Sequence, residues 1–273
     1  MKTTSILITG AGTGIGKDSA FALARLGYRV LAGTHTTAQG AALRAEVKKA
    51  SVEMEIFKLD ITNAADVRRA AAMKPDILIN NAGVGESGPL AEVPFERIEN
   101  IVETNVLGTL RLTQECAAHM LQRKAGRIIT VTSVAGRVVL PYLGIYHLTK
   151  FALEAAFDSL RMELAPRGIQ VSMVEPGLIY TGFNEEMAAT KYRWLKPTSF
   201  FKDDVPKMKV HDASITPSSH PTDSVVKAIV HAVRARRPKI RYTVPVRYAI
   251  LVFLAKFLPD RLKDTVMRKF AGL

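Results

Sequence analysis

The chain has 273 residues, of which 48% are apolar and 23% are charged. These proportions allow a sizeable hydrophobic core and exclude a chain that is disordered throughout. The one cysteine, Cys116, excludes an internal disulfide framework and fits a reducing compartment, so we expect a cytoplasmic protein. We expect no signal peptide, because Met1–Thr4 leads directly into a strand-like run without a long apolar core or a cleavage site.

The net charge of +13 is unevenly distributed along the chain. Residues 1–190 hold 20 Lys and Arg against 19 Asp and Glu, whereas residues 191–273 hold 18 against 6. Such a basic segment predicts either an anionic partner, such as a membrane surface, or a solvated face that binds nothing. It contains no recognition motif or aromatic stacking platform, so we expect no nucleic acid partner.

Short β-type runs alternate with helical patterns along the chain. The expected strands are residues 5–8, 28–32, 52–59, 76–79, 127–131, 169–174 and 240–244. The expected helices are residues 15–26, 38–49, 64–72, 95–123, 145–164 and 222–236. Continuous apolar strands separated by helices are typical of a parallel sheet covered on both faces. We therefore predict a single α/β domain over residues 1–273, doubly wound (Rossmann-type), with about seven strands and helices on both faces.

A glycine-rich segment, Thr9 to Gly16, lies between the first expected strand and the first helix. Such a turn lets the backbone approach a pyrophosphate, whose charge is held by the free N–H groups of the helix N-terminus. Glycine-rich turns also occur without a ligand, so this segment alone only favours a nucleotide site.

Tyr146 and Lys150 lie four residues apart on an expected helix, so their side chains share one face. An ammonium beside a phenol favours the phenolate, which would lower the tyrosine pKa and allow proton exchange with an alcohol or carbonyl oxygen. The same pair also occurs on solvated helix faces. Ser133 strengthens the catalytic interpretation, because it follows the fifth expected strand, at the edge where open α/β sheets bind ligands.

Taken together, these motifs resemble the short-chain dehydrogenase/reductase family, and the resemblance spans nearly the whole chain. The matching segments, in order, are Thr9–Gly16 (T-G-x-x-x-G-x-G), Asn80–Gly83 (N-N-A-G), Asn105–Gly108, Ser133, Tyr146-x-x-x-Lys150, and Pro176-Gly177 with Thr181. Six ordered matches are far more specific than any one of them.

The resemblance implies hydride transfer between NAD(P)(H) and a ketone or secondary alcohol. It implies that Tyr146 is the acid/base and that Ser133 polarises the carbonyl. Lys150 would bind the nicotinamide ribose and lower the Tyr146 pKa, while Asn105 would hold a water in a proton relay. The residues implied to contact the cofactor are Gly10, Thr13, Gly14, Ile15, Gly16, Thr34, His35, Asp60, Ile61, Asn81, Ala82, Gly83, Tyr146, Lys150, Pro176, Gly177, Ile179 and Thr181. No metal site is predicted.

Cofactor choice depends on the residues after the second expected strand. An acidic residue there would select NAD, but the sequence has Thr34-His35-Thr36, which can donate hydrogen bonds and does not repel a 2′-phosphate. We therefore favour NADP(H) and keep NAD(H) as the alternative, because the arginine common in NADP-preferring members is missing and Thr13 and His35 occupy its sites.

Three segments, residues 89–94, 103–108 and 150–154, resemble the hydroxysteroid-dehydrogenase-like branch of the family. That branch implies a hydrophobic ketone or alcohol substrate that is steroid-, retinoid- or lipid-like. Leu140–Leu143 would form an apolar wall of the pocket. The family resemblance also implies a homodimer or homotetramer.

Two segments depart from the strand–helix rhythm. Residues 181–222 contain four prolines and the cluster Thr216–Ser219, which predicts a long loop that would act as a substrate lid. Residues 246–273 form a basic, apolar C-terminal extension whose apolar run is too short and too basic to span a bilayer. The extension could contact a membrane peripherally, pack over the pocket, or pack against another subunit.

A second class of function remains open at this point. A nucleotide-binding regulatory or scaffold protein could keep the fold without turnover. Ser133, Tyr146 and Lys150 argue against it, because a protein that only binds needs no proton donor.

Overall fold

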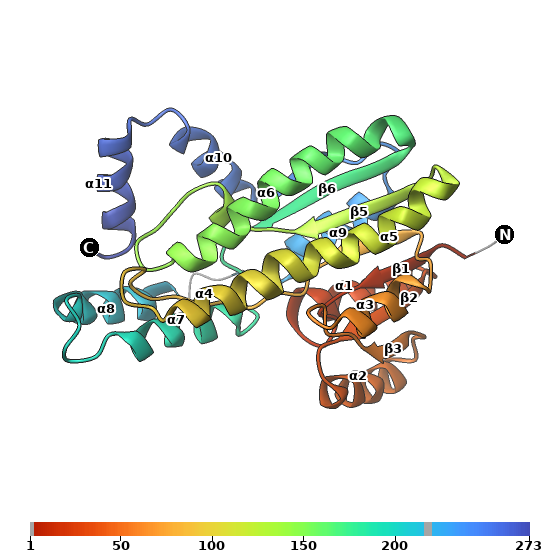
Figure 1. Ribbon diagram of the computed structural model, residues 1–273, viewed down its shortest axis with the longest axis horizontal. Helices are drawn as coiled ribbons and strands as arrows, with labels where there is room; N and C mark the ends of the chain where they lie inside the picture. Colours follow the sequence, from red (N-terminus) through yellow and green to blue (C-terminus); the bar gives the residue numbers. More distant parts are fainter. Residues whose placement is uncertain (1–2, 216–219) are drawn as a thin grey trace.

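The computed structural model describes residues 3–215 and 220–273 (Figure 1). Within these residues, seven parallel strands form one sheet in the order β3-β2-β1-β4-β5-β6-β7. Their bounds are β1 Ser5–Ile8, β2 Arg29–Thr34, β3 Glu55–Lys58, β4 Ile77–Asn80, β5 Gly126–Val131, β6 Ile169–Pro176 and β7 Arg241–Val244. The doubly wound α/β fold predicted from the sequence is confirmed.

Helices cover both faces of the sheet (Figure 1). On one face lie α1 (Gly14–Arg25), α2 (Thr37–Ala50) and α9 (Asp223–Arg234). On the other lie α3 (Ala64–Ala71), α5 (Thr109–Arg123) and α6 (Gly144–Leu164). Both faces are therefore buried, which explains why the central strands read as continuous apolar runs.

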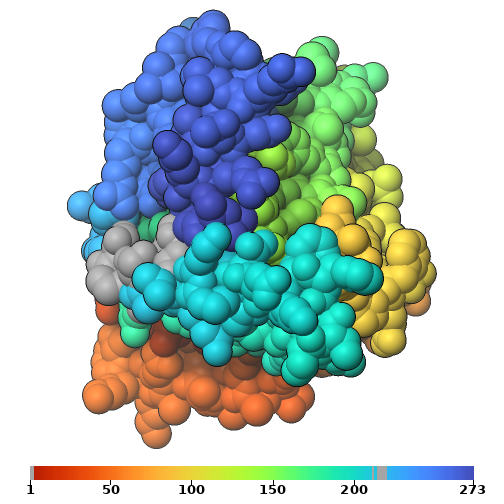
Figure 2. Space-filling view, turned by 90° about the vertical axis from the view of Figure 1, so that its left-hand side faces the viewer, coloured from red at the N-terminus to blue at the C-terminus, as the bar shows by residue number. Residues whose placement is uncertain are grey.

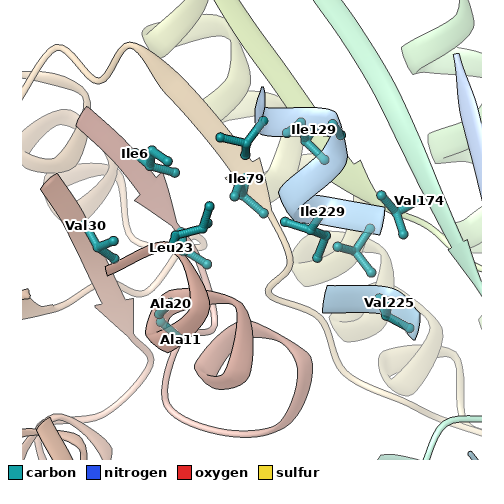
Figure 3. Close-up of a cluster of buried hydrophobic side chains, with 14 of the residues drawn as sticks. Ile6, Ala11, Ala20, Leu23, Val30, Ile79, Ile129, Val174, Val225 and Ile229 are labelled. Carbon is teal, nitrogen blue, oxygen red and sulfur yellow. The ribbon is translucent and has the colours of Figure 1, made fainter. Parts of the chain in front are cut away.

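The alternation of side chains along each strand divides the core into two layers. Ile6, Ile79 and Ile129 point toward α1 and α9, where they meet Leu23 and Ile229 (Figure 3). Their neighbours in the sequence point to the other face, toward α5 and α6. A shift of one residue in the pairing of these strands would exchange the two layers, so the packing of each layer against its own helices favours this register.

The order in which strands are added to the sheet reverses between β1 and β4, which are parallel neighbours in the sheet but not consecutive in the sequence. In open α/β sheets, ligands bind in the crevice outside the carboxyl ends of the strands at this point. The loops after β1 and β4, which begin at Thr9 and Asn81, meet there.

The expected helix at residues 95–123 is interrupted in the middle. It consists of α4 (Phe95–Val102), a π-helical segment at Glu103–Gly108, and α5. Inside a helix, a π-helical segment inserts a residue and redirects side chains, and it is often found at functional sites. Here it holds Asn105, the residue to which the family resemblance assigns the proton relay.

The prediction of a long loop at residues 181–222 is wrong for the residues that the structure describes. They contain α7 (Phe183–Trp194) and α8 (Val205–Ile215). The prolines suggested a loop, but Pro206 is the second residue of α8, where proline is tolerated because its missing N–H has no helical partner. The cluster Thr216–Ser219 lies outside the described residues.

The C-terminal extension forms two helices, α10 (Val246–Ala255) and α11 (Asp260–Phe270), with Pro259 between them. They lie at the same end of the molecule as α7 and α8 (Figures 1 and 2). Among the described residues, none of the helices is long and apolar enough to cross a membrane.

Candidate active site

A cavity of about 850 Å³ opens at the carboxyl ends of the strands. Most of the predicted site residues line it, whereas Gly16, Thr34 and Asn105 do not. Those that line it are Gly10, Thr13, Gly14, Ile15, His35, Asp60, Ile61, Asn81, Ala82, Gly83, Ser133, Tyr146, Lys150, Pro176, Gly177, Ile179 and Thr181. The fold thus brings the glycine-rich turn and the Ser–Tyr–Lys group to opposite parts of one cavity.

The glycine-rich turn presents its backbone to the cavity. Gly10 and Gly14 have φ angles of 64° and 51°, in the left-handed region that favours glycine. A side chain at Gly10 would also lie 2.9 Å from the Cα of Ala82. Helix α1 has no acidic residue in its first turn, so nothing neutralises its free N–H groups and its dipole. This arrangement fits a pyrophosphate.

Gly16 does not line the cavity, and its lack of a side chain is required for packing instead. A Cβ there would lie 2.3 Å from the Gly10 carbonyl oxygen and 2.4 Å from Asn81 Nδ2. The same amide nitrogen donates hydrogen bonds to the carbonyls of Thr9 and Gly10, at 3.0 and 3.2 Å. Asn81 therefore ties the glycine-rich turn to the loop after β4.

Thr9 completes this connection, although it is not among the site residues predicted from the sequence. Its hydroxyl oxygen accepts hydrogen bonds from the backbone N–H groups of Asn81 and Ala82, each at 2.9 Å. The signal that could have found Thr9 was its place as the first residue of the matched glycine-rich segment.

The prediction that Thr34 faces the cofactor is wrong. Its side chain is fully buried, and its hydroxyl lies 3.1 Å from the Thr36 carbonyl oxygen and 3.3 Å from that of Phe57. Thr34 is the last residue of β2, and the alternation of the strand turns its side chain inward. His35 and Gln39 line this part of the cavity instead.

His35 is an exposed donor at the rim of the cavity. Its Nε2 lies 3.9 Å from a carboxylate oxygen of Asp60, and its backbone N–H donates to Gln39 Oε1 at 3.1 Å. Lys17, a basic residue in the first turn of α1, pairs with Glu46 at 3.0 Å. His35, Gln39 and Asp60 are therefore polar side chains at this end of the cavity.

Ser133, Tyr146 and Lys150 meet at the inner part of the cavity, and all three are buried. Tyr146 and Lys150 lie one turn apart near the start of α6, and Ser133 follows the carboxyl end of β5. Lys150 Nζ donates to the Val131 carbonyl at 3.2 Å. An ammonium has three N–H donors, so those that remain can donate to acceptors in the cavity, such as the hydroxyl oxygens of a ribose.

The pKa of Tyr146 departs from its ordinary value in the direction opposite to the one expected. Burial raises the pKa, and the hydrogen bond with Ser133 offsets this only in part. Burial also lowers the pKa of Lys150 to about 8, partly offset by the negative charge of Glu154. The predicted lowering of the Tyr146 pKa by Lys150 is therefore not seen: the phenol is held in its protonated form.

Asn105 lies one layer behind the cavity. Its Oδ1 accepts from the Val84 backbone N–H at 2.8 Å, and its Nδ2 donates to the Val84 carbonyl at 2.9 Å and to Thr149 Oγ1 at 3.2 Å. These bonds attach the loop after β4 to α6. The side chain of Asn105 thus shapes the wall of the cavity, and its role in a proton relay stays a prediction.

His147 supports the loop that follows Ser133. Its Nε2 accepts from the Leu140 backbone N–H at 2.9 Å, and its Nδ1 lies 2.7 Å from the Ala135 carbonyl oxygen. These partners require a neutral ring protonated on Nδ1, and burial lowers the His147 pKa accordingly. His147 therefore fixes the apolar segment ahead of Tyr146.

The C-terminal helices contribute to the cavity, which the sequence analysis allowed as one of three alternatives. A Cβ on Gly177 would lie 2.3 Å from the ring of Tyr248, so glycine is needed for this contact between the loop after β6 and α10. No local signal connects Tyr248 with residues so distant in the sequence. The other lining residues from α10 and α11 are Leu251, Val266, Met267 and Phe270.

The two helices between residues 183 and 215 are joined by a largely buried ion pair. Lys191 Nζ lies 3.0 and 2.9 Å from the two carboxylate oxygens of Asp212, and the Tyr192 hydroxyl donates to the same carboxylate at 2.6 Å. Lys191 and Asp212 both line the cavity. This pair fixes α8 to α7 over the apolar end of the cavity.

Comparisons with known proteins agree with this geometry. The family model described as short chain dehydrogenase matches residues 4–192. An uncharacterized oxidoreductase of Escherichia coli K12, YbbO, is 34% identical over 97% of this chain and 94% of its own length. Bovine retinol dehydrogenase 8 is 30% identical over 94% of this chain and 86% of its own.

The fold is also similar to that of solved short chain dehydrogenase structures. The crystal structure of a short chain dehydrogenase/reductase from Burkholderia phymatum in complex with NAD superposes with a TM-score of 0.80. It is 23% identical in sequence, and the match covers 93% of each chain.

Proposed function

Since the chain belongs to the short chain dehydrogenase family, we propose that it reduces a hydrophobic ketone with NADPH, or oxidises the corresponding secondary alcohol with NADP. The observation that carries the proposal is the convergence of Ser133, Tyr146 and Lys150 in a cavity whose other part is the glycine-rich turn. When bound, the nicotinamide supplies or accepts the hydride. The residues of this chain bind, orient and exchange the proton.

Tyr146 would donate a proton to the carbonyl oxygen of a ketone. Because burial raises its pKa, the phenol is protonated at neutral pH and can act as the acid. The Ser133 hydroxyl would donate a second hydrogen bond to the same oxygen as negative charge develops on it. Both side chains come from rigid elements of the fold, which favours a fixed geometry.

Lys150 would hold the ribose that carries the nicotinamide. Its ammonium is buried, and among the described residues its hydrogen-bond acceptor is the Val131 carbonyl. A buried charge with unused donors is unfavourable unless it finds further acceptors. Ribose hydroxyls would supply them, and the charge would also stabilise the phenolate that forms when Tyr146 gives up its proton.

The substrate end of the cavity supports an apolar, steroid-, retinoid- or lipid-like molecule. Apolar side chains from four parts of the chain meet there: Val138, Leu140, Leu143, Phe183, Met187, Leu251, Val266 and Phe270. Such a wall stabilises a bound apolar ligand in proportion to the apolar surface area that binding removes from water. The relation to retinol dehydrogenase 8, whose name states a retinoid alcohol, agrees with this substrate class.

We favour NADP(H) over NAD(H) because of the residues at the adenosine end. His35 offers a ring N–H at the rim of the cavity, and no carboxylate occupies the end of β2. A carboxylate there would accept hydrogen bonds from a ribose 2′-hydroxyl and repel a 2′-phosphate. Asp60 is close to His35, and its carboxylate already accepts from the backbone and hydroxyl of Thr62 at 2.9 and 2.7 Å.

The family resemblance also leads us to propose a homodimer or homotetramer. Leu148 and Phe151 support it, because both are exposed apolar residues on the outer face of α6. Light scattering on the purified protein would test this. A monomer at all concentrations would rule out the assembly without affecting the proposed reaction.

A screen of apolar ketones with NADPH and NADH, which follows the loss of reduced nicotinamide, tests the proposed function. We expect turnover with long-chain, cyclic or retinoid carbonyls, and a higher kcat/KM with NADPH. Tight binding of the nucleotide without turnover of any carbonyl would instead favour the non-catalytic regulatory or scaffold protein.

A further inference from the structure

We propose that α10 and α11 form a docking surface for an anionic lipid bilayer, and that the cavity opens at this surface so that apolar substrate enters from the membrane. The second clause rests on the proposed function, whereas the first does not. The surface consists of one apolar stripe on each helix and the basic residues that border the two stripes.

Helix α10 and the turn after it expose an apolar stripe instead of a polar face. The residues spaced along one side are Val246, Ile250, Phe253 and Phe257, and each is more than half exposed. The Phe253 and Phe257 rings contact each other, with their centres 5.1 Å apart. The opposite side of the helix, at Tyr248, Val252 and Ala255, is buried against the protein. The exposed stripe therefore has no partner within the described chain.

Helix α11 continues this apolar surface. Leu262, Val266 and Phe270 are spaced four residues apart, so they lie along one side of the helix, and all three are exposed. Val266 and Phe270 also line the cavity. A side chain that both lines a cavity and is exposed lies at its mouth. The apolar surface of α11 thus leads into the substrate end of the cavity.

Basic side chains border both stripes. Helical geometry, at 3.6 residues per turn, places Arg247 and Lys256 on the two sides of the α10 stripe. It places Lys263, which also pairs with Asp260 at 3.2 Å, and Lys269 on the two sides of the α11 stripe. Apolar side chains with basic borders are the arrangement by which interfacial helices bind anionic bilayers, with the apolar groups in the acyl region and the ammonium groups near the lipid phosphates.

The position of this surface, at one end of the molecule, also supports docking to a bilayer. Figure 2 shows the two C-terminal helices side by side with α7 and α8 at one end of the molecule. This is the end onto which the strand ends and the cavity open. A bilayer against α10 and α11 would therefore face the mouth of the cavity, and an apolar substrate would reach Tyr146 without crossing bulk water.

The charges argue against a second copy of the chain as the occupant. In a symmetric dimer, the same surface of each copy meets the other, so the basic borders would face one another. Residues 191–273 hold 18 basic and 6 acidic residues, so few carboxylates are available there to offset this repulsion. Lipid phosphates supply the opposite charge.

Co-sedimentation with vesicles tests the docking surface. The full chain is mixed with vesicles of phosphatidylglycerol and phosphatidylcholine, and with phosphatidylcholine alone, across a salt series. We expect binding to the anionic vesicles that weakens as salt rises, because screening shortens to about 8 Å at physiological ionic strength. Equal and negligible sedimentation in every condition would overturn the proposal.

Two variants address the two parts of the surface. Phe253→Ser removes an exposed apolar side chain, and Met162→Ser is its control, since Met162 is 61% exposed against 60% for Phe253 and lies at the far end of α6. Lys256→Gln/Lys263→Gln/Lys269→Gln removes three border charges. Its control is Lys48→Gln/Lys49→Gln/Arg68→Gln on α2 and α3, which are exposed and lie at the other end of the sheet.

The triple border variant should bind the anionic vesicles about a hundredfold more weakly, at roughly fivefold for each charge. Phe253→Ser should also weaken binding, and both controls should match wild type. The proposal is overturned if the controls weaken binding as much as the surface variants. It is also overturned if Phe253→Ser turns a dimer into a monomer while sedimentation is unchanged, because the surface would then join two copies of the chain.

Substrate entry is tested separately, with a long-chain methyl ketone dissolved in the vesicles and a short-chain one dissolved in water. Both surface variants should raise the KM for the long ketone and leave the KM for the short one unchanged. If the KM for the long ketone were the same in the surface variants as in wild type, entry from the membrane would be excluded. Lack of turnover with either ketone would defeat the proposed function but leave the sedimentation result intact.

Discussion

The Lys150 ammonium nitrogen lies 5.6 Å from the centre of the Tyr146 ring, and both side chains are buried beside the same cavity. Burial acts on them in opposite directions, since it raises the pKa of the phenol and lowers that of the ammonium to about 8. At neutral pH the pair is therefore a protonated phenol beside a charged amine, which is the state required to protonate a ketone oxygen.

This relation predicts the pH dependence of ketone reduction. Below pH 8, Lys150 is charged and Tyr146 is protonated, so kcat/KM should be constant. Above pH 8, Lys150 loses its proton, and kcat/KM should fall by about tenfold for each further pH unit. The measurement is steady-state reduction between pH 6 and 10. A profile that stays flat to the ordinary tyrosine pKa would show that Lys150 charge is not needed.

Lys150→Ala should weaken nucleotide binding as well as turnover. Loss of hydrogen bonds to a charged group costs about 1.5–3 kcal/mol, which corresponds to a rise of roughly ten- to a hundredfold in the Kd for NADPH. Lys150→Arg keeps a charge that persists at alkaline pH, so any activity that it retains should lack the fall above pH 8. An unchanged Kd for NADPH in Lys150→Ala would refute the proposed ribose contact.

His35→Asp should shift the preference from NADPH toward NADH. The new carboxylate would repel a 2′-phosphate and accept from a 2′-hydroxyl, and we expect kcat/KM with NADPH to fall about tenfold or more. Thr34→Asp is the matched control, because it adds the same charge at a buried position. It should lower the Tm without changing the preference. Wild-type protein that already prefers NADH would contradict this account of the adenosine end.

His147→Ala should destabilise the protein and weaken substrate binding. It leaves the partly buried N–H of Leu140 without its acceptor, which costs up to about 3 kcal/mol in the free energy of unfolding. The KM for the ketone should rise, because the apolar wall between Ala135 and Leu143 loses its support. Urea unfolding measures the first effect. Met162→Ala, at an exposed position of the same helix, is the control, and equal stability of the two variants would exclude the supporting role.

The sequence predicts the fold and most of the cavity well, because these depend on local patterns. The spacing of Tyr146 and Lys150 puts them on one helix face, and Ser133 follows a strand at the edge where parallel sheets bind ligands. The alternation of side-chain direction along the strands divides their apolar side chains between the two helix layers. These predictions need only the geometry of one element at a time.

The remaining features depend on contacts between distant residues. Thr34 is the last residue of β2, and the alternation of side chains along the strand turns it inward. A difference of one residue in the position where β2 ends therefore decides whether the side chain of Thr34 or that of His35 reaches the cavity. Tyr248 and Phe270 meet the cavity only once the C-terminal helices fold back over the end of the sheet at which the cavity opens. Prolines suggested a loop where α8 forms, because sequence composition does not show that Pro206 occupies a permitted first-turn position.

Tyr146→Phe tests the central residue of the mechanism. Only the hydroxyl is lost, so the Kd for NADPH should stay close to wild type while kcat falls by about a hundred- to ten-thousandfold. Isothermal titration gives the Kd, and steady-state kinetics gives kcat. A rate close to wild type would mean that another group supplies the proton.

The most direct measurement follows the hydride itself. Wild-type protein is incubated with an apolar ketone and NADPH deuterated at the nicotinamide C4 position, and the alcohol is analysed by mass spectrometry. The account predicts one deuterium on the carbinol carbon of the product, and almost no labelled alcohol with Tyr146→Phe in the same time. Consumption of NADPH without deuterium in the alcohol, or no alcohol from any ketone, would contradict it.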